Sequence, residues 1–412
     1  MQDPPIDEEP LVAIAARRAL ERLRAQAATP EFGRLLWLQA TGAAGDTLVA
    51  IALAGSLFFF VPPATARTRV LLYLALTMAP FALVAPLLAR YLDRHRAGLK
   101  LAMVASALGR GTLAWLLATR LDRGLWLFPI AFGILLLSRA GQIVRGALLP
   151  HLAPQDRTLL AANATVTRIS ALAGFVAALP GLALARWLGV GAELLLCASV
   201  YYLGALPALL LPAGRGLRPQ QERAGARGAA RSVHVRQAVV LAAGVRALVG
   251  FLVFHLAFSF RREDLGTLGL GFLVGAAALG GLCGALLAPK LRRRLKEEGI
   301  LVAGALVGGL AALLAGRWFS LVSAGGLVLA FGAAAGAAKL AFDAIVQRET
   351  PEAARGWAFA RYESILQLCW VAGALVPVAV ALPGGVGVVG AGLAANLLAL
   401  LYVLGRHRVA LR

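Results

Sequence analysis

Six ionisable side chains stand inside apolar stretches of the sequence, where they can bind a charged cargo or carry a proton. A charge at the centre of a membrane helix costs at least about 2.5–3.5 kcal/mol, so each of these residues needs a compensating role. Four are arginines, which favour an anionic or zwitterionic head group as cargo if two or more of them face one cavity. The six are Asp46, Arg110, Arg139, Arg168, Arg246 and His255.

Asp46 is the single acid of that set, about twelve residues into its apolar stretch. At about 1.5 Å per residue, this depth places it near the middle of a bilayer. Its carboxyl group can carry a coupling proton, because apolar surroundings favour the neutral form. It can equally be a permanent counter-ion of Arg110 or Arg139, or contact a cationic substrate. His255 has two alternatives as well, titration near neutral pH or a hydrogen-bonded packing role.

A second charged group stands near the end of a later apolar stretch. Lys339 and Asp343 are four residues apart and therefore share one face of a helix, where they neutralise each other. Their alternative role is a cytoplasmic gate with Arg361 or Glu363, which begin the next apolar stretch.

Motifs of the common enzyme classes are absent from the sequence. It contains no Gly-x-x-x-x-Gly-Lys-Ser/Thr nucleotide loop, no His-Glu-x-x-His and no Gly-x-Ser-x-Gly. Cys197, Cys283 and Cys369 all stand in apolar stretches and match no metal-ligand spacing. We therefore expect no catalytic residue, no metal and no cofactor, and we expect that the protein is not an enzyme.

The elements that position these residues are membrane helices. Hydrophobic residues make up 60% of the chain and its mean hydropathy is +0.77, which excludes an ordinary soluble domain. Apolar runs approach or exceed the roughly 20 residues that cross a bilayer, and they lack the period-two alternation of membrane strands. We expect an all-α polytopic protein with twelve spans at 34–60, 70–90, 99–119, 125–147, 159–185, 189–211, 237–259, 266–288, 299–316, 320–345, 357–382 and 386–405.

The net charge of +21 is distributed as in a membrane protein. With the N-terminus in the cytoplasm, the cytoplasmic connections carry 20 Lys and Arg residues and the outer connections carry 8. This positive-inside bias predicts that both termini are cytoplasmic, and it disfavours a nucleic-acid partner.

The sequence also indicates an internal duplication. Short segments return after 199 residues, among them 43–45 as 242–244 and 173–174 as 372–373. Six spans precede a Gly-, Arg- and Gln-rich segment and six follow it, so the halves are expected to be parallel six-helix bundles. The predicted organisation is a cytoplasmic leader at 1–33, bundles at 34–213 and 237–405, a linker at 214–236 and a tail at 406–412.

Residues 89–100, between the second and third spans, carry Asp93-Arg94 within a short basic turn. This segment resembles the cytoplasmic turn motif of the major facilitator superfamily, and the resemblance covers about 34–405. It implies that Asp93 and Arg94 belong to a cytoplasmic gate, with Asp93 facing the start of the eleventh span. Arg139-x-x-Gln142 is similar to the start of the family's antiporter motif, and segments 148–168 and 339–363 are similar to bacterial efflux members.

Together these features predict a monomeric twelve-span secondary transporter in a bacterial cytoplasmic membrane, embedded in the lipid bilayer. We expect alternating access and proton-coupled export of a small amphiphilic, anionic or zwitterionic molecule. One alternative is a flippase for lipids or lipid-linked molecules, which requires a cavity that opens sideways to the bilayer. The other is a scaffold or partner subunit without transport, which requires paired charges and no cavity.

Overall fold

The computed structural model describes residues 29–57, 98–119, 124–154, 158–211, 233–262, 266–351 and 354–410. Within these residues it contains eleven helices, each long and apolar enough to cross a membrane. The predicted span at 70–90 lies outside the described residues, as do residues 1–28 of the predicted leader and most of the predicted linker. Each of the other eleven predicted spans coincides with one helix.

The helices form two groups along the chain. The first group is α2 (Pro30–Leu57), α4 (Gly98–Thr119), α5 (Gly124–Leu152), α6 (Leu159–Trp187) and α7 (Val190–Leu209). The second group is α9 (Val233–Arg262), α10 (Gly266–Leu291), α11 (Glu297–Arg317), α12 (Leu321–Glu349), α13 (Arg355–Ala379) and α14 (Gly384–Ala410).

Several helices extend beyond the apolar runs that predicted them. α2 begins at Pro30, α9 begins inside the predicted linker at Val233, and α14 continues to Ala410 inside the predicted tail. Hydropathy marks only the hydrocarbon core, whereas a helix continues through the polar interfacial layer of the bilayer. The polar first turns of α9, with His234 and Arg236, illustrate this difference.

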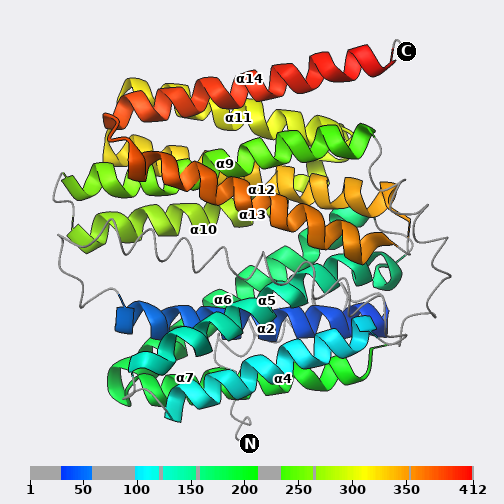
Figure 1. The fold of residues 1–412 in the computed structure, drawn as a ribbon, viewed down its shortest axis with the longest axis vertical. Coiled ribbons are helices and arrows are strands. Elements are labelled where there is room, and N and C mark those ends of the chain that lie inside the picture. The colour runs from blue at the N-terminus through cyan, green and yellow to red at the C-terminus, as the bar shows by residue number, and fades with distance from the viewer. Residues whose placement is uncertain are drawn as a thin grey trace, which may run out of the picture.

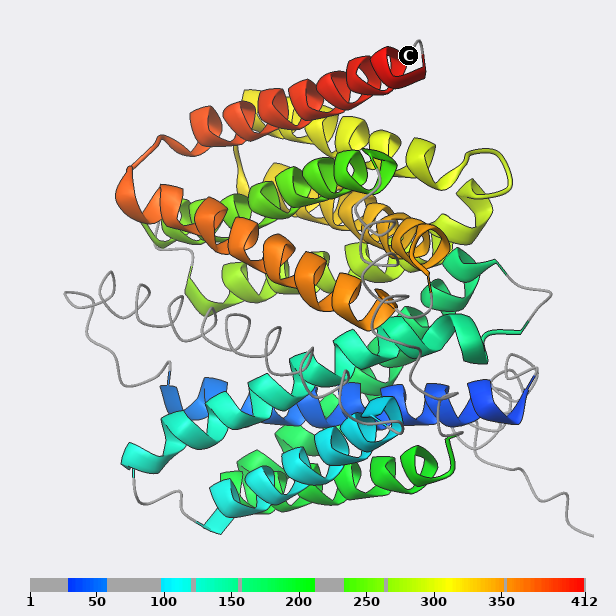
Figure 2. The ribbon, with the colours of Figure 1, turned by 45° about the vertical axis from the view of Figure 1, so that its right-hand side comes forward.

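The two groups form two bundles that lie one above the other in Figure 1 and stay separate in Figure 2. α2 begins and α14 ends on the right-hand side of Figure 1, which is also where α7 ends and α9 begins. We call this side the linker end of the bundles, and the other side the opposite end.

Equivalent helices pair in the two bundles, as the duplication predicts. α2 packs on α6 as α9 packs on α13, and α4 packs on α7 as α11 packs on α14. Gly174 of α6 lies against Thr47, and its repeat counterpart Gly373 of α13 lies so close to α9 that a Cβ atom would overlap the carbonyl oxygen of Ala247. Close approach through small residues is the usual basis of membrane helix packing.

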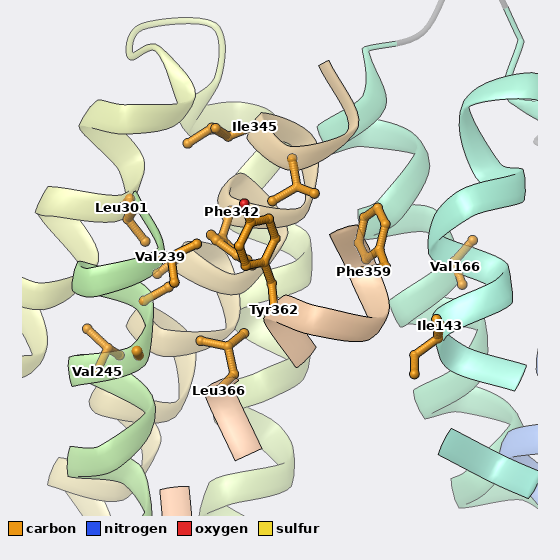
Figure 3. Close-up of a cluster of buried hydrophobic side chains, with 14 of the residues drawn as sticks. Ile143, Val166, Val239, Val245, Leu301, Phe342, Ile345, Phe359, Tyr362 and Leu366 are labelled. Atoms are coloured by element: carbon orange, nitrogen blue, oxygen red, sulfur yellow. The ribbon is translucent and has the colours of Figure 1, made fainter. Parts of the chain in front are cut away.

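The bundles contact each other at the linker end. There α5 and α6 pack on α10, α12 and α13. Phe359 of α13 reaches toward Ile143 and Val166 of the first bundle (Figure 3), and its ring covers Gly146. A second apolar cluster joins Leu160 of α6 to residues of α10 and α12. The space between the bundles is therefore closed at this end by apolar packing.

Candidate substrate cavity

A cavity of about 650 Å³ lies between the two bundles. Residues of α5 and α6 line one side, and residues of α9, α10, α12 and α13 line the other. Most of the lining is small or aliphatic. The charged lining residues are Arg145, Arg246, Lys339, Asp343 and Glu363.

A smaller cavity of about 260 Å³ lies within the first bundle and adjoins the larger one. Asp46 and Arg110 line it. The two cavities share four lining residues, Gln142, Arg145, Thr167 and Ser170.

The Asp46 carboxylate accepts three hydrogen bonds. Its donors are Arg110 Nη1 at 3.2 Å, Ser138 Oγ at 2.8 Å and Tyr201 Oη at 2.7 Å. The Arg110 guanidinium also donates from Nε to the carbonyl oxygen of Ser106 at 3.0 Å, and it lies 4.7 Å from the centroid of the Tyr201 ring. Arg110 is almost buried, whereas the Asp46 side chain is 37% exposed. Asp46 is thus the counter-ion of Arg110 and still reaches the cavity, so its role as proton carrier or permanent partner stays a prediction.

Lys339 joins α12 to α13 through two ion pairs. Its Nζ atom lies 2.6 Å from Asp343 Oδ1, as the four-residue spacing predicts, and 3.0 Å from Glu363 Oε2. Two carboxylates therefore share one ammonium group at the cavity wall. The predicted partner Arg361 is elsewhere: it is exposed, with its guanidinium 5.6 Å from the centroid of the Trp357 ring.

Two cavity arginines make neither a hydrogen bond nor an ion pair within the described part of the chain. Arg145 of α5 lines both cavities, and its Nε atom is buried without an acceptor. Arg246 of α9 lines the larger cavity from the other bundle, within electrostatic range of Glu363 and Arg139. Sequence reasoning found Arg246 but left out Arg145, which stands two residues before the end of the predicted span at 125–147. Its spacing, three residues after Gln142 and six after Arg139, was the available signal.

Three predicted cavity residues line neither cavity. Arg139 donates to Gln142 Oε1 at 3.2 Å, and Arg168 donates to Thr165 Oγ1 at 3.1 Å. Both arginines thus hydrogen-bond along their own helices.

The third of these residues is His255, which is buried between α9 and the start of α14. Its Nε2 atom lies 2.9 Å from the carbonyl oxygen of Gly384, and its ring stacks on Phe251 with centroids 5.0 Å apart. This is the environment of the packing alternative, and the role of His255 stays a prediction. The predicted gate residues Asp93 and Arg94 lie outside the described residues.

Uncharged polar contacts close the linker end between the bundles. Asn163 Nδ2 of α6 donates to Gln347 Oε1 of α12 at 2.7 Å, and Gln347 Nε2 donates to the carbonyl oxygen of Gly146 in α5 at 3.1 Å. Further out, Arg355 Nη1 lies 3.3 Å from His151 Nε2. Among the described residues, no group of three or more His, Cys, Asp or Glu side chains is arranged to hold a metal ion.

Sequence comparison finds relatives of undetermined function. No family model matches the chain. An uncharacterized protein of Mycobacterium leprae is 30% identical over 388 residues, which is 84% of this chain and 66% of that protein. An uncharacterized protein of Mycobacterium tuberculosis is 34% identical over 149 residues, which is 35% of this chain and 27% of that protein. The chain thus spans just under two thirds of the first relative and about a quarter of the second.

Solved structures share this architecture over 90–92% of the chain. A bacterial homologue of the iron transporter ferroportin, in an outward-facing state, has a TM-score of 0.70 at 18% identity over 90% of this chain and 99% of its own. The transporter FucP in the outward conformation has a TM-score of 0.73 at 11% identity over 91% of this chain and 98% of its own. The human organic anion transporter MFSD10 has a TM-score of 0.64 at 16% identity over 92% of this chain and 99% of its own.

The chain therefore has the fold of the major facilitator superfamily, as its sequence resemblance implied. These structural neighbours are themselves transporters.

Proposed function

We propose that the protein is a secondary transporter that carries a small anionic or zwitterionic amphiphile between its two bundles. The observation that carries this proposal is the inter-bundle cavity, in which Arg145 and Arg246 face the same space from opposite bundles. Neither has a hydrogen-bond or ion-pair partner among the described residues, so both can bind an anion. The cavity volume of about 650 Å³ is within the usual range of small-molecule sites.

Charge balance in the larger cavity favours an anionic group. With ordinary ionisation, its lining carries three cations and two anions. Both anions lie within 3.0 Å of Lys339, so these three groups together carry a charge of −1. The two arginines carry +2, which leaves the lining with one positive charge in excess. A guanidinium group binds a carboxylate, sulfonate or phosphate through two parallel hydrogen bonds, which suits it to this task.

The remaining lining explains the preference for an amphiphile. Residues such as Ala277, Gly281 and Leu282 of α10 present an apolar wall opposite the charges. An apolar tail lying on this wall gains roughly 25 cal/mol for each Å² removed from water.

Alternating access is supported by where the bundles touch. Apolar packing and the Asn163–Gln347 hydrogen bond close the linker end, and the predicted topology makes that end cytoplasmic. On this topology the described state is closed toward the cytoplasm. Proton-coupled export, the direction expected from the sequence, has Asp46 as its candidate carrier, because a proton on Asp46 competes with Arg110 for the same carboxylate.

Transport assays in proteoliposomes test the cargo class. Radiolabelled taurocholate serves as the anionic amphiphile and tetraphenylphosphonium as the cationic one. We expect exchange of taurocholate only, and we expect Arg145→Gln and Arg246→Gln each to weaken it by about tenfold or more, the loss of one charge-assisted contact. Arg317→Gln, at the far end of α11, is the matched control. Exchange of the cation alone, or full activity of both cavity variants, contradicts the proposal.

Coupling is tested separately at Asp46. In Asp46→Asn we expect pH-gradient-driven transport to disappear while counterflow, the exchange of substrate for substrate, persists. Flux under gradients of either sign gives the direction of transport. Loss of both activities together with loss of folding favours a purely structural Asp46–Arg110 pair.

The two alternatives receive less support. A lipid flippase needs a sideways opening, yet α6 and α10 contact each other at the linker end, in the apolar cluster that holds Leu160 and Ala288. A scaffold without transport needs paired charges and no cavity, whereas the space between the bundles holds two arginines that make no ion pair among the described residues.

A further inference from the structure

A buried carboxyl group lies in the first bundle outside both cavities. Glu193, in the first turn of α7, has a fully buried side chain, and neither carboxylate oxygen has a hydrogen-bond partner among the described residues. The free-energy cost of isolating a carboxylate from water is many times larger than the stabilisation that a helix N-terminus gives to a negative charge. The geometry therefore favours a protonated, neutral Glu193.

Two more groups that can carry protons follow on the same face of α7. Cys197 and Tyr201 come four and eight residues after Glu193, and both are buried. Side chains four residues apart are neighbours on a helix. The Cys197 thiol donates to the carbonyl oxygen of Gly45 at 3.4 Å, and the Tyr201 hydroxyl donates to Asp46 Oδ1 at 2.7 Å. We call Glu193, Cys197 and Tyr201 the column. It begins near the opposite end of the bundle and ends at Asp46.

The surroundings of this column are apolar. Leu48 and Val49 of α2, Leu117 of α4 and Ile134 of α5 belong to the same buried cluster as Cys197 and Tyr201. The helices packed against α7 are α2, α4 and α6. Their described charged groups are Glu31, Arg34 and Asp46, then Lys100 and Arg110, then Arg168 and Arg186. Of these, Asp46 and Arg110 contact the Tyr201 end of the column, and none forms an ion pair with Glu193.

We propose that Glu193, Cys197 and Tyr201 form a proton path along α7 that connects the opposite end of the first bundle with Asp46. This rests on the proposed function, in which Asp46 carries the coupling proton. In one transfer Tyr201 gives its hydroxyl proton to Asp46 and receives one from the Cys197 thiol, which must first turn away from the carbonyl oxygen of Gly45. The carboxyl group of Glu193, which makes no hydrogen bond to Cys197 in this structure, must turn toward the thiol to restore its proton, and it then takes a new proton from solvent. One proton enters, one reaches Asp46, and substrate uses a separate route through the larger cavity.

Infrared spectroscopy of the full chain in lipid nanodiscs tests the first element without any substrate. A protonated carboxyl group has its own C=O stretching band, which is absent when the group is ionised. We expect such a band at neutral pH in the wild type, its loss in Glu193→Gln and its retention in the control Glu31→Gln. A wild-type spectrum from which Glu193→Gln removes no protonated-carboxyl band overturns the path.

Proteoliposomes loaded with taurocholate test the connection to Asp46. Because Ala and Ser are similar in size, Cys197→Ala and Cys197→Ser separate packing from proton transfer, since only Ser keeps a group that passes on a proton. We expect pH-gradient-driven flux to fall roughly 10²-fold in Glu193→Gln and Cys197→Ala, the low end of what a positioned proton-transfer group contributes. Cys197→Ser is expected to keep most of the flux, and counterflow is expected to persist in all three variants.

The outcomes distinguish this inference from the proposed function. If the wild type shows no counterflow, the proposed function fails, and the infrared band alone then decides on Glu193. Counterflow with unchanged pH-driven flux in Glu193→Gln or Cys197→Ala overturns the path and leaves the transporter assignment intact. An equal loss in Cys197→Ser and Cys197→Ala overturns it too, because it shows a packing role.

Discussion

The side-chain amides of Asn163 and Gln347 meet at 2.7 Å across the boundary between the bundles, and both residues are buried. Gln347 also bonds the backbone of α5 at Gly146, so one amide ties α12 to two helices of the other bundle. These bonds carry no net charge and lie beside the apolar contact of Phe359. Opening of the linker end must break them.

The first prediction concerns this amide bridge. Gln347→Leu removes the acceptor of Asn163 across the boundary, leaving it the carbonyl oxygen of Leu159 in its own helix. It also removes the side-chain donor of the Gly146 carbonyl. When the linker end is closed this costs about 1–3 kcal/mol, and in that state alone. The population should therefore shift about 5–150-fold toward states open at that end. Distances between spin labels on α5 and α12 measure the shift. Gln237→Leu, in which the amide lies within one bundle, is the control, and identical distance distributions in both variants contradict the prediction.

A second prediction concerns the Asp46–Arg110 pair. Asp46→Asn and Arg110→Gln should each lower the thermal unfolding temperature, because each leaves the charge of the other residue without its counter-ion. The double variant should lose less than the sum of the two, since the groups touch. Thermal unfolding of the four proteins in one detergent measures this cycle. Strict additivity is the result that argues against the pair as a stabilising contact.

The third prediction concerns the shared ammonium group. Lys339→Met leaves Asp343 and Glu363 near each other without a cation, which costs as much as about 3–5 kcal/mol for a buried pair. Partial exposure of Lys339, at 35%, makes this an upper figure. Neutralising all three side chains together should restore most of the lost stability. Unfolding temperatures measure this loss, and a variant at an exposed lysine, Lys290→Met, is the control. A Lys339→Met protein as stable as the wild type contradicts a stabilising role of the Lys339–Asp343–Glu363 group.

Close helix contact gives the fourth prediction. A Cβ atom at Gly373 overlaps backbone of α9, whereas one at Gly275 meets nothing within 4 Å. Gly373→Ala should therefore destabilise the second bundle by about 1–3 kcal/mol, the usual cost of overpacking, and Gly275→Ala should be neutral. Gly174→Ala should cost less than its repeat counterpart, because it meets the hydroxyl of Thr47, a side chain that can rotate. Unfolding temperatures of the three variants give the order.

Sequence reasoning located eleven helices because a bilayer requires long apolar runs, and the length of each run can be read from the local sequence. It also indicated the paired bundles, since the return of 173–174 at 372–373 marks two equivalent helix contacts. The spacing of Lys339 and Asp343 was enough to predict their contact, because both lie on one helix.

Contacts between helices needed the tertiary structure. Arg110 pairs with Asp46, whereas Arg139 hydrogen-bonds within its own helix. Nothing in the sequence distinguishes these two arginines, so both were equally good candidates for the counter-ion of Asp46. Arg145 and Glu193 were missed for a related reason: one stands at the end of its run and the other in the first turn of its helix. Local hydropathy decides which residues enter the membrane. Which charges meet there is decided by how the helices turn toward one another, and that depends on packing between residues far apart in the chain.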